Sequence, residues 1–241
     1  MDNFQRREMI DVTFDHRTDS NGKDPDLHSP TLRKHHQELW AKELPSGVTL
    51  TLEKIPNHYL FHTSRHGEFS LSSDTISNSV RSHKKLKHIT TQIPSAELDS
   101  FQALGATIGG KILFPGKKID KKLTINVARG LNSKIKDRFD LTLECIRLQY
   151  QGLGNPLSKT LMTYWAFFEL FENFERYVQF FHLKDLLQNG EIKFFLPFED
   201  GFNRPPLPTS VEEYVLYRKN TMNFVAARNL RIQTWVDSEN S

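Results

Sequence analysis

Aromatic side chains crowd one stretch of this 241-residue chain, and no other feature restricts its fold as strongly. The stretch follows Pro156 and contains Tyr164, Trp165, Phe167, Phe168, Phe171, Phe174, Tyr177, Phe180 and Phe181. These residues cover too wide an arc for a helix that lies on the surface. We therefore expect a central helix that the rest of the chain encloses. The composition, 37% hydrophobic and 25% charged, is that of an ordinary globular protein.

Most other segments of the C-terminal half also favour helices. Apolar residues recur at spacings of three and four over 135–150, which predicts an amphipathic helix. Ser210 and Glu213 form the pattern of a capping box that opens a final helix. Residues 191–198 are expected to form one late strand. We therefore predict a mostly helical part over residues 131–241.

The N-terminal part mixes strand and helix signals. Helices are expected after Ser29-Pro30 and after Pro94-Ser95, and Ser72-Ser73-Asp74 is expected to cap a third helix that runs toward His88. Strands are expected at 9–14, 48–52, 59–62, 69–71, 107–114 and 123–127. These elements predict an α+β fold with a single domain over residues 1–241. Its mixed sheet, from residues 9–130 and 190–198, would be braced by the helical part.

Positive charge is concentrated in the middle of the chain. Residues 81–138 hold 13 Lys and Arg against 4 Asp and Glu, an excess of +9, although the whole chain carries only +3. The side chains expected to bind nucleic acid are Lys84, Lys85, Lys117, Lys118, Lys121 and Lys122, the last four at the tip of a hairpin between the strands 107–114 and 123–127. The alternative is a solvated, lysine-rich turn that maintains solubility.

The sequence gives little support for a metal site or for a membrane-bound protein. The single cysteine, Cys145, excludes an internal disulfide and a multi-cysteine metal site. Nine of the ten histidines precede residue 90, but no His-Glu-x-x-His pattern occurs, so we expect no metal site. No apolar stretch is long enough to span a membrane, and the N-terminus lacks the apolar core of a signal peptide. We expect a cytoplasmic protein that does not bind membranes.

Several runs of residues resemble the motifs of an uncharacterised bacterial domain family. These runs include Leu39-Trp40-x-Lys42-x-Leu44-Pro45-x-Gly47, Gly67-Glu68-Phe69-x-Leu71-Ser72-Ser73-Asp74, Thr107-Ile108-Gly109-Gly110, Phe114-Pro115-Gly116 and Asp137-Arg138-Phe139-Asp140-Leu141-Thr142-Leu143-Glu144-Cys145-Ile146-Arg147. The resemblance covers nearly the whole chain. It implies a stand-alone bacterial domain, and it transfers no mechanism.

One set of polar residues could form a site. Asp137, Asp140, Glu144 and Arg147 are spaced 3, 4 and 3, so they share one face of the helix predicted over 135–150. Asn126 and Arg129 precede this face closely in the chain. The alternative is a solvent-exposed helix surface on which these charges pair with one another.

One hypothesis assigns these residues to transfer of ADP-ribose from NAD to RNA or DNA. Residues 60–64 faintly resemble the histidine-containing strand of ADP-ribosyltransferases, whose chemistry needs a group that holds the nucleotide and a carboxylate that stabilises an oxocarbenium ion. With Asn126 and Arg129 added from the polar set above, the hypothesis has NAD bound by His62, Ser72, Asn126 and Arg129, and it names His62, Ser73, Arg129 and Glu144 as catalytic residues. Glu68 is a second candidate for the carboxylate.

Two other functions stay open. A nuclease could hold Mg²⁺ through Asp137, Asp140 and Glu144 and grip the backbone with its lysines. A non-catalytic module could bind nucleic acid or an acidic protein through the same lysines. We expect an enzyme directed at nucleotides or nucleic acids, of the kind used as a toxin or in phage defence, for which a neutralising antitoxin protein is a conceivable partner.

Overall fold

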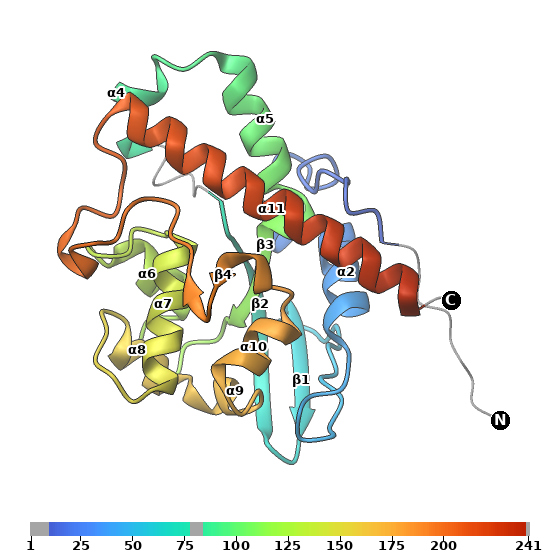
Figure 1. Cartoon of the computed structure of the whole chain (residues 1–241). Helices are drawn as coiled ribbons and strands as arrows, with labels where there is room; N and C mark the ends of the chain where they lie inside the picture. Colours follow the sequence, from blue (N-terminus) through green and yellow to red (C-terminus); the bar gives the residue numbers. More distant parts are fainter. Residues whose placement is uncertain (1–9, 78–83, 240–241) are drawn as a thin grey trace.

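The computed structural model describes residues 10–77 and 84–239 and has an α+β fold (Figure 1). Its main sheet has three antiparallel strands in the order β1-β2-β3: β1 (Leu60–Ser64), β2 (Gly67–Thr75) and β3 (Lys111–Pro115). A tight turn joins β1 to β2, and there Gly67 adopts a φ of 128°, which few other residues tolerate. In the register, Leu60 pairs with Leu71, and Thr75 pairs with Lys111. The second half of β2, residues 72–75, therefore has β3 on one side and no strand on the other.

Helices surround this sheet and account for most of the regular structure. In the N-terminal part they are α1 (Pro25–His28), α2 (Pro30–Trp40), α4 (Lys87–Thr90), α5 (Ser95–Gly105) and the 3-10 turn η1 (Ile108–Gly110). After β3 follow α6 (Ile125–Leu131), α7 (Phe139–Tyr150), α8 (Ser158–Thr163), α9 (Trp165–Glu169), α10 (Phe174–Phe180), η2 (Lys184–Leu186), the hairpin of β4 (Leu187–Gln188) and β5 (Glu191–Ile192), η3 (Gly201–Asn203) and α11 (Val211–Glu239). The long helix α11, red in Figure 1, crosses one face of the molecule from α4 to α2.

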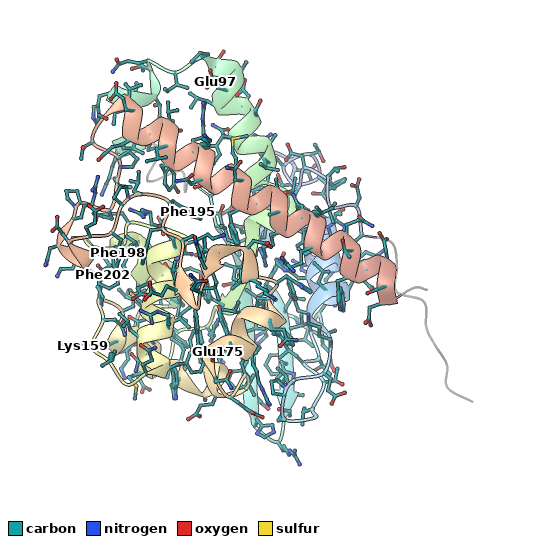
Figure 2. The ribbon with its side chains drawn as sticks, in the orientation of Figure 1. Glu97, Lys159, Glu175, Phe195, Phe198 and Phe202 are labelled. Atoms are coloured by element: carbon teal, nitrogen blue, oxygen red, sulfur yellow. The ribbon has the colours of Figure 1, made fainter. Side chains whose placement is uncertain are left out.

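One hydrophobic core joins the two parts of the chain. It contains residues from α2, β3, α9 and α11, such as Leu39, Leu113, Phe168 and Val236, all of them fully buried. Phe195 follows the β4–β5 hairpin and packs beneath α11 (Figure 2), with its ring 5.9 Å from that of Tyr217. The expected single α+β domain is therefore confirmed.

The aromatic stretch is buried as predicted, but it is not one helix. Phe167, Phe168 and Phe171 are fully buried, and the rings of Phe167 and Phe171 lie 5.4 Å apart. The chain breaks into α8, α9 and α10. Glu172 has a φ of 64°, and the side chain of Asn173 caps α10 by accepting a hydrogen bond from the Arg176 amide. These local signals end the helix within the aromatic pattern.

Several predicted strands are wrong. The sheet is antiparallel and not mixed, residues 10–14 are irregular with one turn, and of residues 48–52 only Thr49 makes a β-bridge, to Glu43. Met9 lies outside the described residues. Of the strand expected at 191–198, only β5 forms, and it pairs with β4 away from the main sheet. Short apolar runs resemble strands in the sequence. In the structure, tertiary contacts bury these runs although their backbone is irregular.

Two errors affect the candidate site directly. Residues 123–127 do not form the strand of a hairpin, because the Thr124 side chain accepts a hydrogen bond from the Val127 amide and starts α6. The lysines expected at a hairpin tip lie in the loop between β3 and α6. Ser72-Ser73-Asp74 is not a helix cap but the open half of β2. Part of the helix expected toward His88 lies outside the described residues.

The local helix signals were more reliable. The Ser29 side chain caps α2 by accepting from the Leu32 amide, and Pro30 occupies the first turn. The helix after Pro94-Ser95 is α5, and α11 begins directly after Ser210, whose hydroxyl accepts from the Glu213 amide. No helix within residues 10–77 and 84–239 is long and apolar enough to cross a membrane.

Candidate functional site

A cleft of about 790 Å³ lies at the open half of β2. The loop before α1, the end of β2, helices α5 and α6 and the start of α11 form its walls. Its lining includes Lys23, Asp24, Asp26, Asp74, Thr75, Phe101, Lys111, Asn126, Val127, Gly130, Asp137 and Tyr214. Four carboxylates thus face one cavity of a size that fits a nucleotide.

Asp74 is the carboxylate with the most perturbed acidity. Burial raises its pKa to about 6, although the charge of Arg129 favours the ionised form. The neighbouring carboxylates of Asp26 and Asp137 raise the pKa further. Its side chain keeps 16% of its surface exposed, so it is still reachable from the cleft. Around pH 6 both the protonated and the ionised form of Asp74 are therefore populated.

Arg129 holds Asp74 in place from behind. Its side chain is completely buried and forms an ion pair with the Asp74 carboxylate through Nη1. Nε donates to the Thr142 hydroxyl (2.9 Å) and Nη2 to the Asp137 carbonyl oxygen (2.9 Å). Asp137 itself has a φ of 65°, a conformation that costs energy for a residue other than glycine. One guanidinium group thus fixes β2, α7 and the turn before α7 relative to one another.

A chain of hydrogen bonds leads from the core to Asp26. Trp40 Nε1 donates to His36 Nδ1 (3.0 Å), so the neutral His36 ring carries its proton on Nε2 and donates to the Ser73 hydroxyl (3.0 Å). Ser73 in turn donates to Asp26 Oδ1 (3.3 Å), which also accepts from Lys111 Nζ (2.6 Å). Complete burial holds the pKa of His36 well below its usual value. His36 is therefore a donor to Ser73 and not the base that would activate a serine nucleophile.

Four of the residues predicted from the sequence do meet at this end of β2. Asn126 Nδ2 donates to the Ser72 hydroxyl (3.2 Å) and to the Ser73 carbonyl oxygen (3.0 Å), and Arg129 lies one turn further along α6. Asn126 lines the cleft, whereas Ser73 and Arg129 are buried in its wall. They support the lining residues.

His62 and Glu144 lie elsewhere. His62 pairs opposite Phe69 and shares hydrogen bonds with Thr51 and Ser64. Since Phe69 is four residues from Ser73 along β2, roughly 13 Å separate His62 from this end of the strand. Burial lowers the pKa of His62, but this residue does not line the cleft.

Glu144 lies on α7, where both of its carboxylate oxygens accept hydrogen bonds from Arg147 at 2.8 Å. Asp140 is fully buried, pairs with Arg138 and accepts from the Phe195 amide (2.8 Å). The trio expected to hold Mg²⁺ is thus dispersed, since only Asp137 reaches the cleft. Among the described residues, no three His, Cys, Asp or Glu side chains are arranged to hold a metal ion.

The predicted nucleic-acid-binding lysines are exposed. Lys117, Lys118, Lys121 and Lys122 occupy the loop that leads to α6, and Lys84 and Lys85 precede α4. The Tyr164 hydroxyl anchors the loop by donating to the Lys117 carbonyl oxygen (3.1 Å).

Sequence reasoning missed three central residues, Asp26, Lys111 and Asp74. Asp74 ends one of the runs that carry the family resemblance, where the sequence predicts a helix cap, and Lys111 directly follows the run 107–110. The polar run Ser72-Ser73-Asp74 directly after an apolar strand was the available signal, because a strand that continues into polar residues often ends at a site.

A family model described as "Family of unknown function (DUF6994)" matches residues 10–232. The chain belongs to this family. The match agrees with the expected uncharacterised domain family, and it includes every residue of the cleft. No curated protein and no solved structure matches the chain, and similarity to ADP-ribosyltransferases is not found.

Proposed function

We propose that the cleft is the active site of an enzyme that acts on the ribosyl group of a nucleotide, with Asp74 as its acid–base residue. The observation that carries this proposal is a carboxylate with a pKa of about 6 at the wall of a nucleotide-sized cleft. Asp74 takes the role that the sequence hypothesis gave to Glu144.

The balance of donors and acceptors in the lining supports a sugar as the bound group. Lys111 is engaged by Asp26, and Arg129 is engaged by Asp74. The lining holds four carboxylates against the three cations Arg17, Lys23 and Lys111, of which Arg17 is bound to Asp15 and Lys111 to Asp26. Beside Asp26, Asp74 and Asp137 the cleft therefore offers mainly acceptor oxygens. A ligand rich in hydroxyl donors, such as ribose, satisfies such a surface, whereas a phosphate group would be repelled. Phosphates would therefore lie away from these carboxylates, toward Lys23, an exposed cation of the lining.

The chemistry that we propose breaks the bond between ribose and base, and the electron pair leaves with the base. A base that is uncharged in the nucleotide needs a proton on another atom of its ring as it leaves, and protonated Asp74 donates it. The ionised carboxylate then takes the proton of the water or acceptor hydroxyl that adds to the ribose carbon. The nicotinamide of NAD leaves as a neutral molecule and needs no proton, so ionised Asp74 alone serves by stabilising the oxocarbenium ion. Transfer of ADP-ribose to RNA or DNA is one form of this reaction.

The pH dependence tests the proposal. Base release is measured by chromatography between pH 5 and 8, with NAD in one series and neutral nucleosides, nucleotides and RNA in another. Activity with NAD should rise with pH through about 6, because Asp74 must be ionised, and activity with a neutral base should fall through the same value. No release from any of these substrates would contradict the proposal.

Asp74→Asn and Glu144→Gln form a matched pair of variants. Asp74→Asn should lower turnover by roughly 100-fold or more, while Glu144→Gln, whose partner is Arg147 on the same helix, should keep it. Since Asp74→Asn deprives Arg129 of its counter-charge, folding is checked by circular dichroism, and Asp74→Glu provides a second variant that should shift the pH profile. A folded Asp74→Asn protein with normal turnover would refute the assignment.

A further inference from the structure

Exposed aliphatic side chains recur at every fourth residue along α6 and the loop before it. Ile119, Leu123, Val127 and Leu131 are 44%, 42%, 38% and 53% exposed. Val127 and Leu131 lie one turn apart on α6 and therefore share its outer face. Leu123 directly precedes the capping residue Thr124, so its side chain lies near the first turn of the helix. We call these four residues the aliphatic stripe.

Positive charges flank this stripe. Lys117, Lys118, Lys121, Lys122 and Lys134 are all exposed, and Asp120 is the only acidic residue in the same segment before Asp137. Apolar residues with a rim of one charge sign are typical of a surface that binds a partner of the opposite charge. The surface therefore fits a ligand that is both acidic and apolar.

The nature of the exposed side chains favours a protein over the other polyanions. Nucleic acid would bind the lysines, but its backbone and bases would leave aliphatic groups without a stacking partner. Lipid interfaces favour Trp and Phe, and none of the strongly exposed apolar side chains in the described residues is aromatic. An acidic helix with an apolar face would cover the stripe and neutralise the lysines together.

We propose that an acidic protein partner binds α6 and the preceding loop through the aliphatic stripe and the flanking lysines. The position of the aliphatic stripe means that a bound partner also affects the cleft. Val127 belongs to the stripe and also lines the cleft, together with its helix neighbours Asn126 and Gly130. A partner seated on the stripe therefore lies at the mouth of the cleft and obstructs it. Binding itself does not depend on the reaction proposed above; only the inhibition does.

The test uses a synthetic helical peptide with leucine along one face and glutamate along the other, titrated with the full chain and followed by fluorescence anisotropy. Leu131→Ser removes an aliphatic contact on α6, and Leu230→Ser is its control, since Leu230 is an exposed leucine (69%) on α11. We expect Leu131→Ser to weaken binding by about tenfold and Leu230→Ser by less than twofold. Replacing Lys117, Lys118, Lys121 and Lys122 by glutamine should weaken binding and reduce its salt dependence.

Other outcomes would overturn the proposal. Equal effects of Leu131→Ser and Leu230→Ser would show that the stripe is not the contact. The same variants are titrated with poly(U) RNA and with vesicles of 30% phosphatidylserine in phosphatidylcholine. If either of these binds more tightly than the peptide and loses affinity in the lysine variant alone, the surface is one for nucleic acid or for lipid. If the peptide binds as expected but leaves base release unchanged, the docking surface is supported, and the claim that a bound partner obstructs the cleft is refuted.

Discussion

Replacing Gly109 by alanine should be strongly destabilising, because Gly109 lies in η1, directly before β3, and packs closely against α11. A Cβ atom at position 109 would lie 2.3 Å from Asn229 Oδ1 and 2.7 Å from the Val225 carbonyl oxygen. Both are far inside van der Waals contact, and the second belongs to the backbone of α11, which cannot turn away. The helix must therefore move as a whole.

The cost has two parts. Forced overpacking in a well-packed core costs about 1–3 kcal/mol. The movement also disturbs hydrogen bonds, since the Gly109 amide donates to Asn229 Oδ1 (2.7 Å) and its carbonyl oxygen accepts from Arg228 Nη1 (2.9 Å). Leaving one such buried group unsatisfied costs about 1–3 kcal/mol more. We expect a loss of roughly 3–5 kcal/mol, or about 10 °C in Tm for a chain of this size.

Urea unfolding followed by tryptophan fluorescence measures this loss, and Gly154→Ala is the control. Gly154 has no unusual φ, and a Cβ atom added there would have no other atom within 4 Å. Alanine at this position should leave stability unchanged or raise it by about 0.5 kcal/mol. If Gly109→Ala and Gly154→Ala unfold at the same urea concentration, the close approach of α11 to η1 is not as described.

Three further predictions concern stability. Phe171→Ala should cost about 3–5 kcal/mol by thermal or urea unfolding, because the ring is fully buried among aromatic neighbours; wild-type stability would mean that this segment is peripheral. Burial lowers the pKa of His35 to about 4, so between pH 6.5 and 4 the unfolded chain binds a proton at this residue that the folded chain does not bind. The free energy of unfolding should therefore fall as the pH is lowered through this range, and it should fall less steeply in His35→Gln. Asp74 acts in the opposite direction, because its raised pKa lets the folded chain bind a proton at a higher pH than the unfolded chain does. Glu144→Gln should cost about 1–3 kcal/mol, because the buried Glu144 accepts two hydrogen bonds from Arg147, and no loss would show that this pair does not stabilise the fold.

Features that depend on neighbouring residues could be predicted from the sequence, and features that depend on distant ones could not. Ser29 capping α2 and the burial of the stretch 164–181 follow from local hydrogen bonding and from the need to remove aromatic surface from water. Residues 123–127 show a strand-like alternation, but in the structure the Thr124 side chain caps α6 by accepting a hydrogen bond from the Val127 amide.

The open half of β2 shows why the site was harder to predict. Ser72, Ser73 and Asp74 are unfavourable in strands, yet here they extend β2 because Asn126, His36 and Arg129 satisfy their polar groups. Those partners lie 37 to 55 residues away in the chain. No spacing rule connects them, so only the fold shows that Asp74 lines the cleft and Glu144 does not.

Two carboxylates of the same cleft are held in different ways, and such a difference is what the proposed acid–base role of Asp74 requires. Asp26 accepts hydrogen bonds from the Lys111 ammonium and from the Ser73 hydroxyl. Arg129 divides its donors among Asp74, Thr142 and a backbone carbonyl, so Asp74 receives only part of the compensation for its burial. The charge of Asp26 raises the pKa of Asp74 further. Neutralising Asp26 in Asp26→Asn should therefore lower the pKa of Asp74 and shift the pH–rate profile downward, and an unchanged profile would show that the two carboxylates are not coupled.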